Sequence, residues 1–216
     1  MNAIIVTGGD IDLSLLENYI AENKEDVIIS VDAAITKLEK INVIPHIMVG
    51  DFDTLSDEER LKKYTDLSVE IVKHDPIKDF SDSELAVDRA IGEGIRKIAV
   101  FGALGKRFDH AFANILILQK YKKLGADITI YDRYNKIYVK SNYFILEREK
   151  LWGKYISFFS LEGKNFMEKL EGAKYPIENR IIDNIAAPSL YISNEIKGDK
   201  LEAKFSGDLL VVESRD

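Results

Sequence analysis

The chain has 216 residues, 46% of them hydrophobic, so it is long enough for one large or two small domains with a buried core. Its formal net charge of −7 argues against a protein that neutralises nucleic-acid phosphates with a basic face. It has no cysteine, no basic segment leading into an apolar stretch and no run of about 18 apolar residues, so we expect a cytoplasmic protein without disulfides, thiolate zinc sites or a membrane partner.

The first two thirds of the chain alternates short apolar runs with helical patterns, which is typical of a parallel sheet flanked by helices. In chain order we expect strands at residues 3–7, 27–31, 47–49, 69–72, 98–101 and 127–131, and helices at 13–21, 33–41 and 57–64. A fourth helix begins at Ser81, which has capping-box spacing to Glu84. A fifth follows residues 98–101; Gly125 ends it, and its one apolar face carries Phe108, Ala111, Phe112, Ile115 and Leu116.

From about Tyr134 the pattern changes to strand-like pieces with turn residues between them and no long amphipathic helix. We expect strands at residues 136–139, 143–146, 155–159 and 201–205, and a hairpin in which residues 206–208 turn into a further strand at 209–212. This part of the chain therefore predicts a small β domain after a tight connection. We place the two domains at residues 1–134 and 135–216.

Two aspartates, Asp51 and Asp53, follow the expected strand at 47–49, at the sheet edge where open α/β sheets bind ligands. Two carboxylates so close repel each other by about 1 kcal/mol at 4 Å in bulk water, and more where they are partly buried, so a cation normally accompanies them. Magnesium is typically held by one or two carboxylates plus substrate phosphates. The pair favours a phosphoryl-transfer site, and the alternative is a solvated turn that caps the next helix.

Residues 78–86 add three acidic side chains, Asp79, Asp82 and Glu84, around a helix start. A local explanation accounts for most of them: Ser81 is the cap, Glu84 completes a capping box and Asp82 favours the helix dipole. That explanation leaves Asp79 less well explained, and it does not prevent Asp82 from also reaching a metal.

Residues 102–114 run from a strand through a glycine-containing turn into a helix. Gly102 and Gly105 allow close backbone approach to an anion, and Arg107 offers a fork of donors for phosphate oxygens. The alternative is an ordinary turn in which Arg107 and Asp109 form a surface ion pair. His110 by itself is typical of a hydrogen-bonded helix residue.

In the β part, Ser193 and Asn194 could hydrogen-bond a ligand, although both are also common turn residues. The chain has no Walker sequence, no kinase HRD and DFG set and no GxGxxG motif. A phosphoryl-transfer enzyme with this sequence belongs to a different lineage.

The ordered set GDFDT, KDFSDSE, GALGKRFDH and SNE, which spans residues 50 to 195, resembles the thiamine pyrophosphokinase family. The resemblance implies an ATP:thiamine diphosphotransferase with ATP as co-substrate and Mg²⁺ as cofactor. It implies a parallel-sheet, Rossmann-like α/β nucleotide domain, a small C-terminal β-sandwich domain for thiamine binding and dimerisation, and a homodimer whose active site is completed at the subunit interface.

The resemblance also implies roles for individual residues. Asp51, Asp53 and Asp82 engage magnesium and, with Asp109, form the catalytic set; Asp109 or Asp82 accepts the proton of the thiamine hydroxyl. Ser193 and Asn194 belong to the thiamine side. The ATP side comprises Asp32, Asp79, Gly102, Gly105, Arg107, Asp109, His110 and Asn114.

The sequence departs from the family pattern at a few positions. Ala33 and Ala34 follow Asp32 where the family usually has glycines, Lys106 stands at a usual glycine, and Ile196 offers no aromatic face for thiamine. These departures leave two alternatives open: a related diphosphokinase acting on another heterocyclic alcohol such as a pterin, and a non-catalytic nucleotide- or thiamine-binding regulator.

Overall fold

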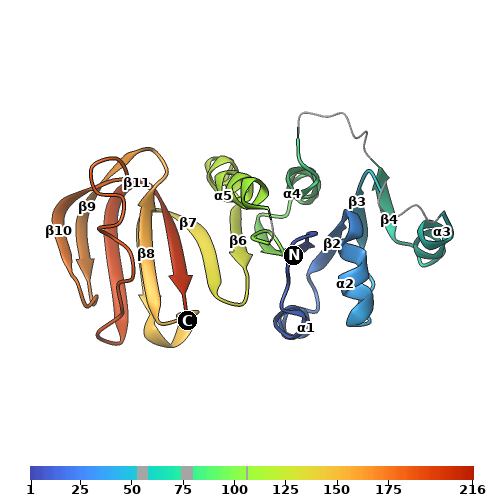
Figure 1. Ribbon diagram of the computed structural model, residues 1–216, viewed down its shortest axis with the longest axis horizontal. Helices are drawn as coiled ribbons and strands as arrows, with labels where there is room; N and C mark the ends of the chain where they lie inside the picture. The colour runs from blue at the N-terminus through green and yellow to red at the C-terminus, as the bar shows by residue number, and fades with distance from the viewer. Residues whose placement is uncertain (53–57, 74–79, 106) are drawn as a thin grey trace. The chain divides into compact units, whose positions relative to one another are not determined.

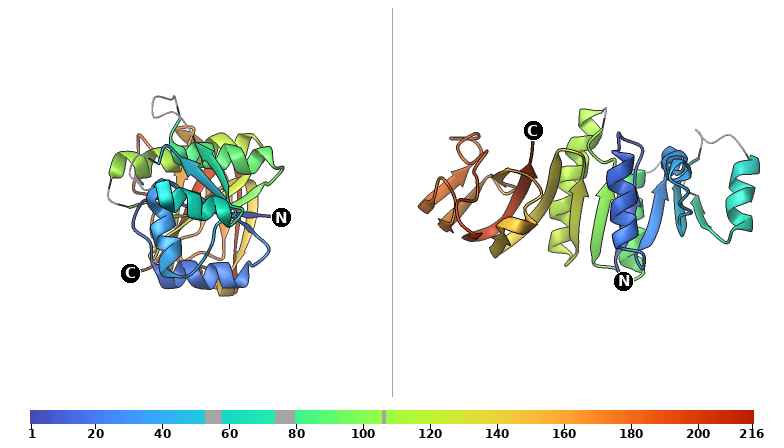
Figure 2. Two further views of the ribbon diagram at one scale, coloured as in Figure 1. Left: turned by 90° about the vertical axis from the view of Figure 1, so that its right-hand side faces the viewer. Right: turned by 90° about the horizontal axis from the view of Figure 1, so that it is seen from below.

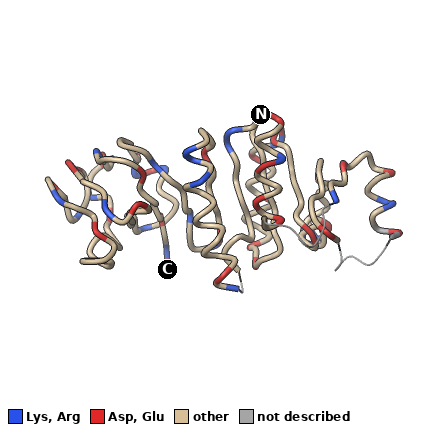
Figure 3. The backbone as a smooth tube through the Cα atoms, turned by 90° about the horizontal axis from the view of Figure 1, so that it is seen from above, with Lys and Arg blue, Asp and Glu red and all other residues tan. Residues whose placement is uncertain are grey.

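The computed structural model describes residues 1–52, 58–73, 80–105 and 107–216. The chain is a mixed α/β protein, as expected, and it divides into two compact units, Met1–Arg133 and Tyr134–Asp216 (Figure 1). No helix within the described ranges is long and apolar enough to cross a membrane. Basic and acidic residues are interspersed in both units (Figure 3).

Six parallel strands form the sheet of the first unit, in the order β6-β5-β1-β2-β3-β4. The expected strands are all present, with ends that differ by at most one residue. Because the chain builds outward from β1 through β2, β3 and β4 and then returns to add β5 on the other side of β1, the strand order reverses between β1 and β5. The strands are β1 (Ala3–Val6), β2 (Val27–Val31), β3 (Ile47–Gly50), β4 (Glu70–Lys73), β5 (Lys97–Phe101) and β6 (Asp127–Tyr131).

Helices cover both faces of this sheet, with α1 on one face and α4 and α5 on the other (Figures 1 and 2). On the α1 face, Leu16 and Ile35 share a buried cluster with Ile4, Ile28 and Met48, which alternate with residues of the opposite face. The helices are α1 (Leu13–Glu22), α2 (Ile35–Lys40), α3 (Glu58–Asp66), α4 (Asp82–Gly92) and α5 (Phe108–Lys123); a 3₁₀ turn, η1 (Asp32–Ala34), precedes α2.

Two local expectations for the helices have different outcomes. Ser81 caps α4 as predicted, since its Oγ accepts a hydrogen bond from the Glu84 N–H at 3.3 Å. Glu84 does not complete a capping box, because its carboxylate pairs with Lys120 of α5 at 2.6 Å. In the same pair of helices, the Tyr121 hydroxyl donates to Asp88 Oδ1 at 2.6 Å, so α4 and α5 are tied together at two levels.

The apolar face predicted for α5 is only partly buried. Ala111 is buried, but Phe108, Phe112 and Leu116 are 79%, 52% and 48% exposed. The inward side of the helix carries Leu118 and Tyr121 instead. Because the two phenylalanines stack with ring centroids 6.1 Å apart, they form an exposed apolar stripe with Leu116.

The second unit consists of antiparallel strands around a buried cluster that includes Phe144, Phe158, Met167, Leu201 and Phe205. Strand β11 is its centre: it pairs with β7 along nearly its whole length, with β9 through its first half and with β8 through its second half. Strand β10 pairs with β9. The elements are β7 (Asn135–Glu147), η2 (Arg148–Lys150), β8 (Tyr155–Ser160), β9 (Lys164–Glu171), β10 (Ile177–Asp183) and β11 (Lys200–Ser214).

The hairpin predicted at residues 206–208 is wrong. Residues on both sides of this segment belong to the single strand β11 and pair with the same neighbour, β7, with a shift in register between Lys204 and Asp208. Gly207 has φ +71° and its N–H donates to the Asn142 side chain at 3.1 Å. The glycine therefore makes a bulge rather than a turn, and the two strands predicted at 136–139 and 143–146 are likewise one strand, β7.

Candidate functional site

A cavity of about 420 Å³ lies in the first unit, where the strand order reverses. Its walls come from the loops after β1, β2 and β5 and from the starts of α4 and α5. In open α/β sheets this crevice beyond the carboxyl ends of the strands is where ligands bind. The fold alone therefore makes this cavity the leading candidate for the site.

One wall is made of backbone, because the loop after β1 packs directly against the loop after β5. A Cβ atom on Gly9 would lie 2.1 Å from the Gly102 carbonyl oxygen, and one on Gly105 would lie 2.1 Å from the Asp10 nitrogen. Gly9 N–H donates to Gly102 O at 3.1 Å, and Thr7 donates to Phe101 O from its backbone N–H and its hydroxyl, at 2.9 and 3.1 Å. Glycine is thus required at both positions for the loops to approach this closely.

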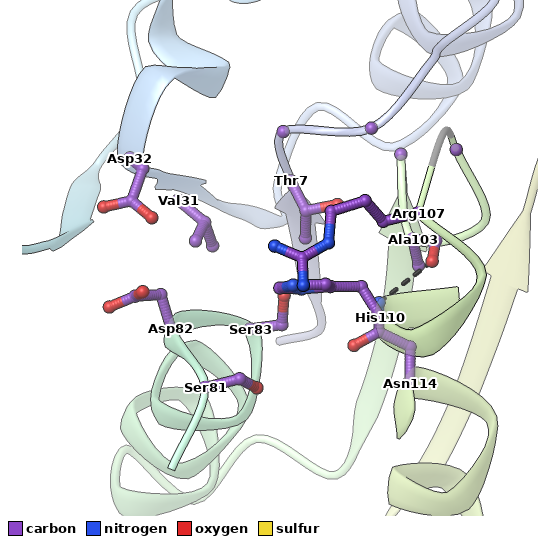
Figure 4. Close-up of a pocket in the computed structure, with 14 residues that line it drawn as sticks. Thr7, Val31, Asp32, Ser81, Asp82, Ser83, Ala103, Arg107, His110 and Asn114 are labelled. Atoms are coloured by element: carbon purple, nitrogen blue, oxygen red, sulfur yellow. Dashed lines mark hydrogen bonds between the residues drawn. The ribbon is translucent and has the colours of Figure 1, made fainter. Parts of the chain in front are cut away.

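The opposite side of the cavity carries carboxylates. Figure 4 shows Asp32 and Asp82 on one side, and Arg107, His110 and Asn114 on the other. Asp32 has φ +46°, and its Oδ1 is buried and accepts no hydrogen bond from the residues that the structure describes. A Cβ atom at Gly50 would lie 1.8 Å from this oxygen, so only glycine at position 50 leaves room for the carboxylate.

Electrostatics identifies the carboxylate side as a place for a cation. Burial, followed by the nearby charges of Asp82 and Asp51, raises the pKa of Asp32 to about 6. A hard divalent ion with oxygen ligands would relieve this repulsion, so the donor set fits magnesium. The described ranges hold no complete cluster of three or more ligating side chains, and Asp53 and Asp79, which were also predicted for the site, lie outside those ranges.

The other side of the cavity carries a positively charged side chain, that of Arg107. Arg107 donates from Nη2 to Asp109 Oδ2 at 2.5 Å and from Nε to Oδ1 at 3.2 Å. The hydrogen bond from Arg107 lowers the pKa of Asp109, and the same bond raises the pKa of Arg107. Arg107 lines the cavity, whereas Asp109 does not, so Asp109 reaches the site through its arginine partner.

Asn114 and His110 complete that side. The Asn114 side chain donates to the Ala103 carbonyl at 2.9 Å, which anchors the loop after β5 to α5 (Figure 4). His110 lines the cavity from the first turn of α5. Lys106, the departure noted at the glycine turn, lies outside the described ranges.

The cavity gathers most of the residues predicted for the ATP side. Six of them line it, namely Asp32, Gly102, Gly105, Arg107, His110 and Asn114, and Asp82 of the predicted metal and catalytic set lines it as well. Sequence reasoning missed the loop after β1, where Thr7, Gly8 and Gly9 also line the cavity. The signal was present, because two glycines directly after an apolar strand mark a place of close backbone approach.

The two residues predicted for thiamine lie in the second unit. Asn194 is 5% exposed; its Oδ1 accepts from the Tyr175 and Glu195 N–H groups at 3.0 and 2.9 Å, and its Nδ2 donates to the Tyr175 carbonyl at 2.8 Å. Ser193 has φ +54°, and its N–H donates to the Ser157 hydroxyl at 3.0 Å. Asn194 borders a second cavity, of about 1080 Å³, together with Tyr175 and Tyr191. Its amide therefore fixes the wall of that cavity.

Two family models match the chain. The model described as the thiamin pyrophosphokinase catalytic domain covers residues 19–130, and the one described as the thiamin pyrophosphokinase vitamin B1 binding domain covers residues 142–210. The thiamine pyrophosphokinase of Bacillus subtilis (strain 168) is 31% identical over 191 residues, which is 87% of each chain.

Solved structures agree with these matches. The crystal structure of thiamine pyrophosphokinase from Bacillus subtilis has a TM-score of 0.85 at 28% identity, with 100% of both chains covered. That of Geobacillus thermodenitrificans has a TM-score of 0.83 at 28% identity, covering 100% of this chain and 98% of the other. Yeast thiamin pyrophosphokinase, at 14% identity, a TM-score of 0.79 and coverage of 98% and 85%, shares the fold. These matches confirm the predicted family: the chain belongs to the thiamin pyrophosphokinase family.

Proposed function

We propose that the chain transfers the diphosphoryl group of ATP to the hydroxyethyl oxygen of thiamine, giving thiamine diphosphate and AMP. The observation that carries this proposal is the two-sided cavity at the strand-order reversal, where Asp32 and Asp82 face a wall of glycine loops and Arg107. A polyphosphate needs cations and N–H donors along its length, and this cavity offers both. The family supports ATP and thiamine as the substrates.

In the reaction, the thiamine oxygen forms a bond to the β-phosphorus of ATP, and the bond from that phosphorus to the α-phosphate oxygen breaks to release AMP. Negative charge develops on the phosphate oxygens, and Arg107, which lines the cavity, would stabilise it together with N–H groups of the glycine loops. Asp51, Asp53 and Asp82 would hold Mg²⁺, which supplies further neutralisation of the phosphate charge when bound.

The thiamine hydroxyl must also lose its proton. Both Asp109 oxygens accept hydrogen bonds from Arg107, and this pairing lowers the pKa of Asp109, so it is a weak proton acceptor. Asp82 lines the cavity and is the better placed of the two predicted candidates. We therefore assign Asp109 to positioning Arg107 and Asp82 to the reaction centre.

We assign residues 1–134 to a Rossmann-like domain that binds ATP, with Asp32, Asp79 and Asn114 on the nucleotide side. Residues 135–216 then form a β-sandwich domain for thiamine binding and dimerisation. The second cavity supports this division, because it lies beside Asn194 within the match to the vitamin B1 binding domain. Ser193 and Asn194 shape that cavity on this assignment.

The proposed assembly is a homodimer with active sites at the interface. The exposed stripe of Phe108, Phe112 and Leu116 lies on α5 of the first domain, and we propose that it adds to the interface formed by the β domain, since a contiguous apolar surface marks an interaction site. We expect sedimentation of the intact protein to give the mass of two chains. The Phe112→Lys variant should give the mass of one chain. Leu124→Lys, at an exposed position beyond the stripe, is the matched control and should stay dimeric. A monomeric wild-type protein contradicts the assembly.

The activity is tested by separating the products after incubation of the protein with Mg²⁺ and ATP, with and without thiamine. We expect AMP and thiamine diphosphate in equal amounts and only when thiamine is present. ADP in place of AMP contradicts diphosphoryl transfer. AMP release with a pterin alcohol in place of thiamine would identify the related diphosphokinase. Binding of ATP or thiamine without any AMP release would identify a regulator.

A further inference from the structure

Lys37, a residue of α2 that lies outside the wall of the ATP cavity, is bonded to the loop after β1. Its Nζ donates to the Thr7 carbonyl at 3.2 Å and to the Gly9 carbonyl. The side chain is half-buried, although a lysine at a surface helix position is normally solvated. An ammonium group that bridges two carbonyls of one short loop fixes the direction of both peptide groups.

The same loop is held from the other side by β5 and the loop that follows it. The N–H groups of Thr7 and Gly9 donate to the Phe101 and Gly102 carbonyls. The carbonyls of residues 7 and 9 thus accept from Lys37 and their N–H groups donate to the β5 side, where the Thr7 carbonyl oxygen also lies close to Gly102. Gly8 lies between them and also lines the cavity, and among the described residues no atom lies within 4 Å of the place where its Cβ would be.

The direction of the Gly8 N–H follows from the geometry of the peptide. The described chain has no cis peptide bond, and in a trans peptide the N–H points opposite to the preceding carbonyl. Because the Thr7 carbonyl turns toward Lys37, the Gly8 N–H turns away from Lys37. Without the lysine, both carbonyls lose the cation that holds them, and a carbonyl that turned toward the cavity would present a partial negative charge to a polyanion.

We propose that Lys37 is a positioning residue for polyphosphate binding: it holds the carbonyls of residues 7 and 9 away from the cavity, so that the loop presents an N–H donor to the phosphates. The inference rests on the proposed function, because it takes the cavity as the ATP site. It assigns to α2 a part in substrate recognition although no residue of that helix lines the cavity.

The test compares Lys37→Met and Lys37→Arg with Lys40→Met, which changes an exposed lysine on the same helix. Binding of ATP, tripolyphosphate and adenosine is measured calorimetrically without turnover. Because a misdirected N–H loses one hydrogen bond to a charged phosphate, we expect Lys37→Met to weaken the binding of ATP and of tripolyphosphate about tenfold and the binding of adenosine less than about twofold. Lys37→Arg, which keeps two or more donors, should restore most of the affinity, and Lys40→Met should behave as wild type.

A merely structural lysine would give a different pattern. The proposal is overturned if Lys37→Met weakens the binding of adenosine and of ATP equally, or if it leaves both affinities unchanged. It is also overturned if the wild-type protein does not bind tripolyphosphate. If Lys37→Met does not fold, Lys37→Gln, a shorter neutral donor, is subjected to the same ligand series. In turnover assays the Met variant should raise the KM for ATP and leave the KM for thiamine unchanged. A wild-type protein that binds tripolyphosphate but makes no thiamine diphosphate refutes the proposed function and leaves the role of Lys37 standing.

Discussion

The two units of the molecule treat their acidic side chains in opposite ways. In the antiparallel unit, Glu213 is fully buried: its Oε2 accepts from the Trp152 N–H at 2.6 Å, and its Oε1, which accepts no hydrogen bond from the described residues, lies 3.1 Å from Lys136 Nζ. In the parallel unit, Asp32 is turned toward Asp82 and Asp51, and one of its oxygens is buried without a hydrogen bond from any described residue. The difference is the neighbouring charge: Glu213 is paired with a lysine, whereas Asp32 faces other carboxylates, an arrangement typical of ligand sites.

The largest expected effect on stability is at Glu213, the buried carboxylate that is paired with a lysine. Glu213→Ala leaves Lys136 without its buried partner and the Trp152 N–H without an acceptor, so we expect a loss of about 3 kcal/mol in the free energy of unfolding. Urea denaturation measures it. The matched control is Glu168→Ala, which breaks the exposed ion pair with Lys204 and should cost about 0.5 kcal/mol. Equal losses in the two variants would mean that the burial of Glu213 has no energetic consequence.

The second prediction concerns the glycine wall of the cavity at the strand-order reversal, and asks whether the packing of its two loops stabilises the fold. Gly9→Ala forces a Cβ to within 2.1 Å of a backbone oxygen, and we expect it to lower the free energy of unfolding by about 2 kcal/mol. Gly8→Ala, one residue earlier, meets no atom of the described chain within 4 Å and should unfold like wild type. Indistinguishable unfolding of the two variants would show that the two loops are not packed against each other.

The third prediction concerns Asp32, the carboxylate that faces other carboxylates. Because the pKa of Asp32 is raised to about 6 from its usual 3.8, the folded state holds this proton more tightly than the unfolded chain does. Its ionisation therefore costs stability, a cost that develops as pH rises from about 4 through 6 and is complete above that range. We expect Asp32→Asn to raise stability at pH 7 by about 1 kcal/mol, after allowance for solvent screening, and to lower turnover.

The readout for Asp32→Asn is thermal unfolding between pH 4 and pH 8, without added metal. The stabilisation should be absent at pH 4 and present at pH 7. Asp66→Asn, at the exposed end of α3, is the control and should follow wild type at every pH. A variant that is less stable than wild type at pH 7 would show that Asp32 is held by favourable contacts rather than by neighbouring charge.

The smallest effect is expected at Asp183 and appears only in acid. Hydrogen bonds from the Ala186 N–H, from Lys164 and from the Ile185 N–H lower the pKa of Asp183 to about 2. Its contribution to stability is therefore present above about pH 4 and is lost as pH falls toward 2. Asp183→Asn should narrow the gap in stability between pH 5 and pH 2. Acid unfolding curves that superimpose would show that this carboxylate has no linkage to folding.

The sequence predicted those parts of the fold that depend on local pattern. Six apolar runs became six parallel strands, and Ser81 capped its helix, because each signal lies within a few residues. The approach of the β1 loop to the β5 loop brought together residues about 95 positions apart, and only their glycines hinted at it. Most of the predicted ATP-side residues met in one cavity because all of them follow strands or begin helices at one edge of a parallel sheet.

The wrong or missed features depend on long-range partners. Gly207 looked like a turn residue, but the side chain of Asn142, on a different strand, accepts its N–H and makes the segment a bulge. Glu84 matched a capping box, yet Lys120 competed successfully for its carboxylate. Lys37 carried no motif, since its role depends on carbonyls about 30 residues earlier in the chain. Such contacts have no periodicity that a sequence pattern would reveal.

The two ties between α4 and α5 fix a dimension of the site. Tyr121 with Asp88 and Lys120 with Glu84 hold the two helices together. Asp82 is the first residue of α4 and Arg107 is the N-cap of α5. These two contacts therefore also influence the distance between the acidic and the basic side of the cavity. The packing of α4 against α5 thus fixes the distance between Asp82 and Arg107. We therefore expect a phosphate chain that is too short to reach from Asp82 to Arg107 to gain the attraction of one side only, so that the length of the ligand matters as well as its charge.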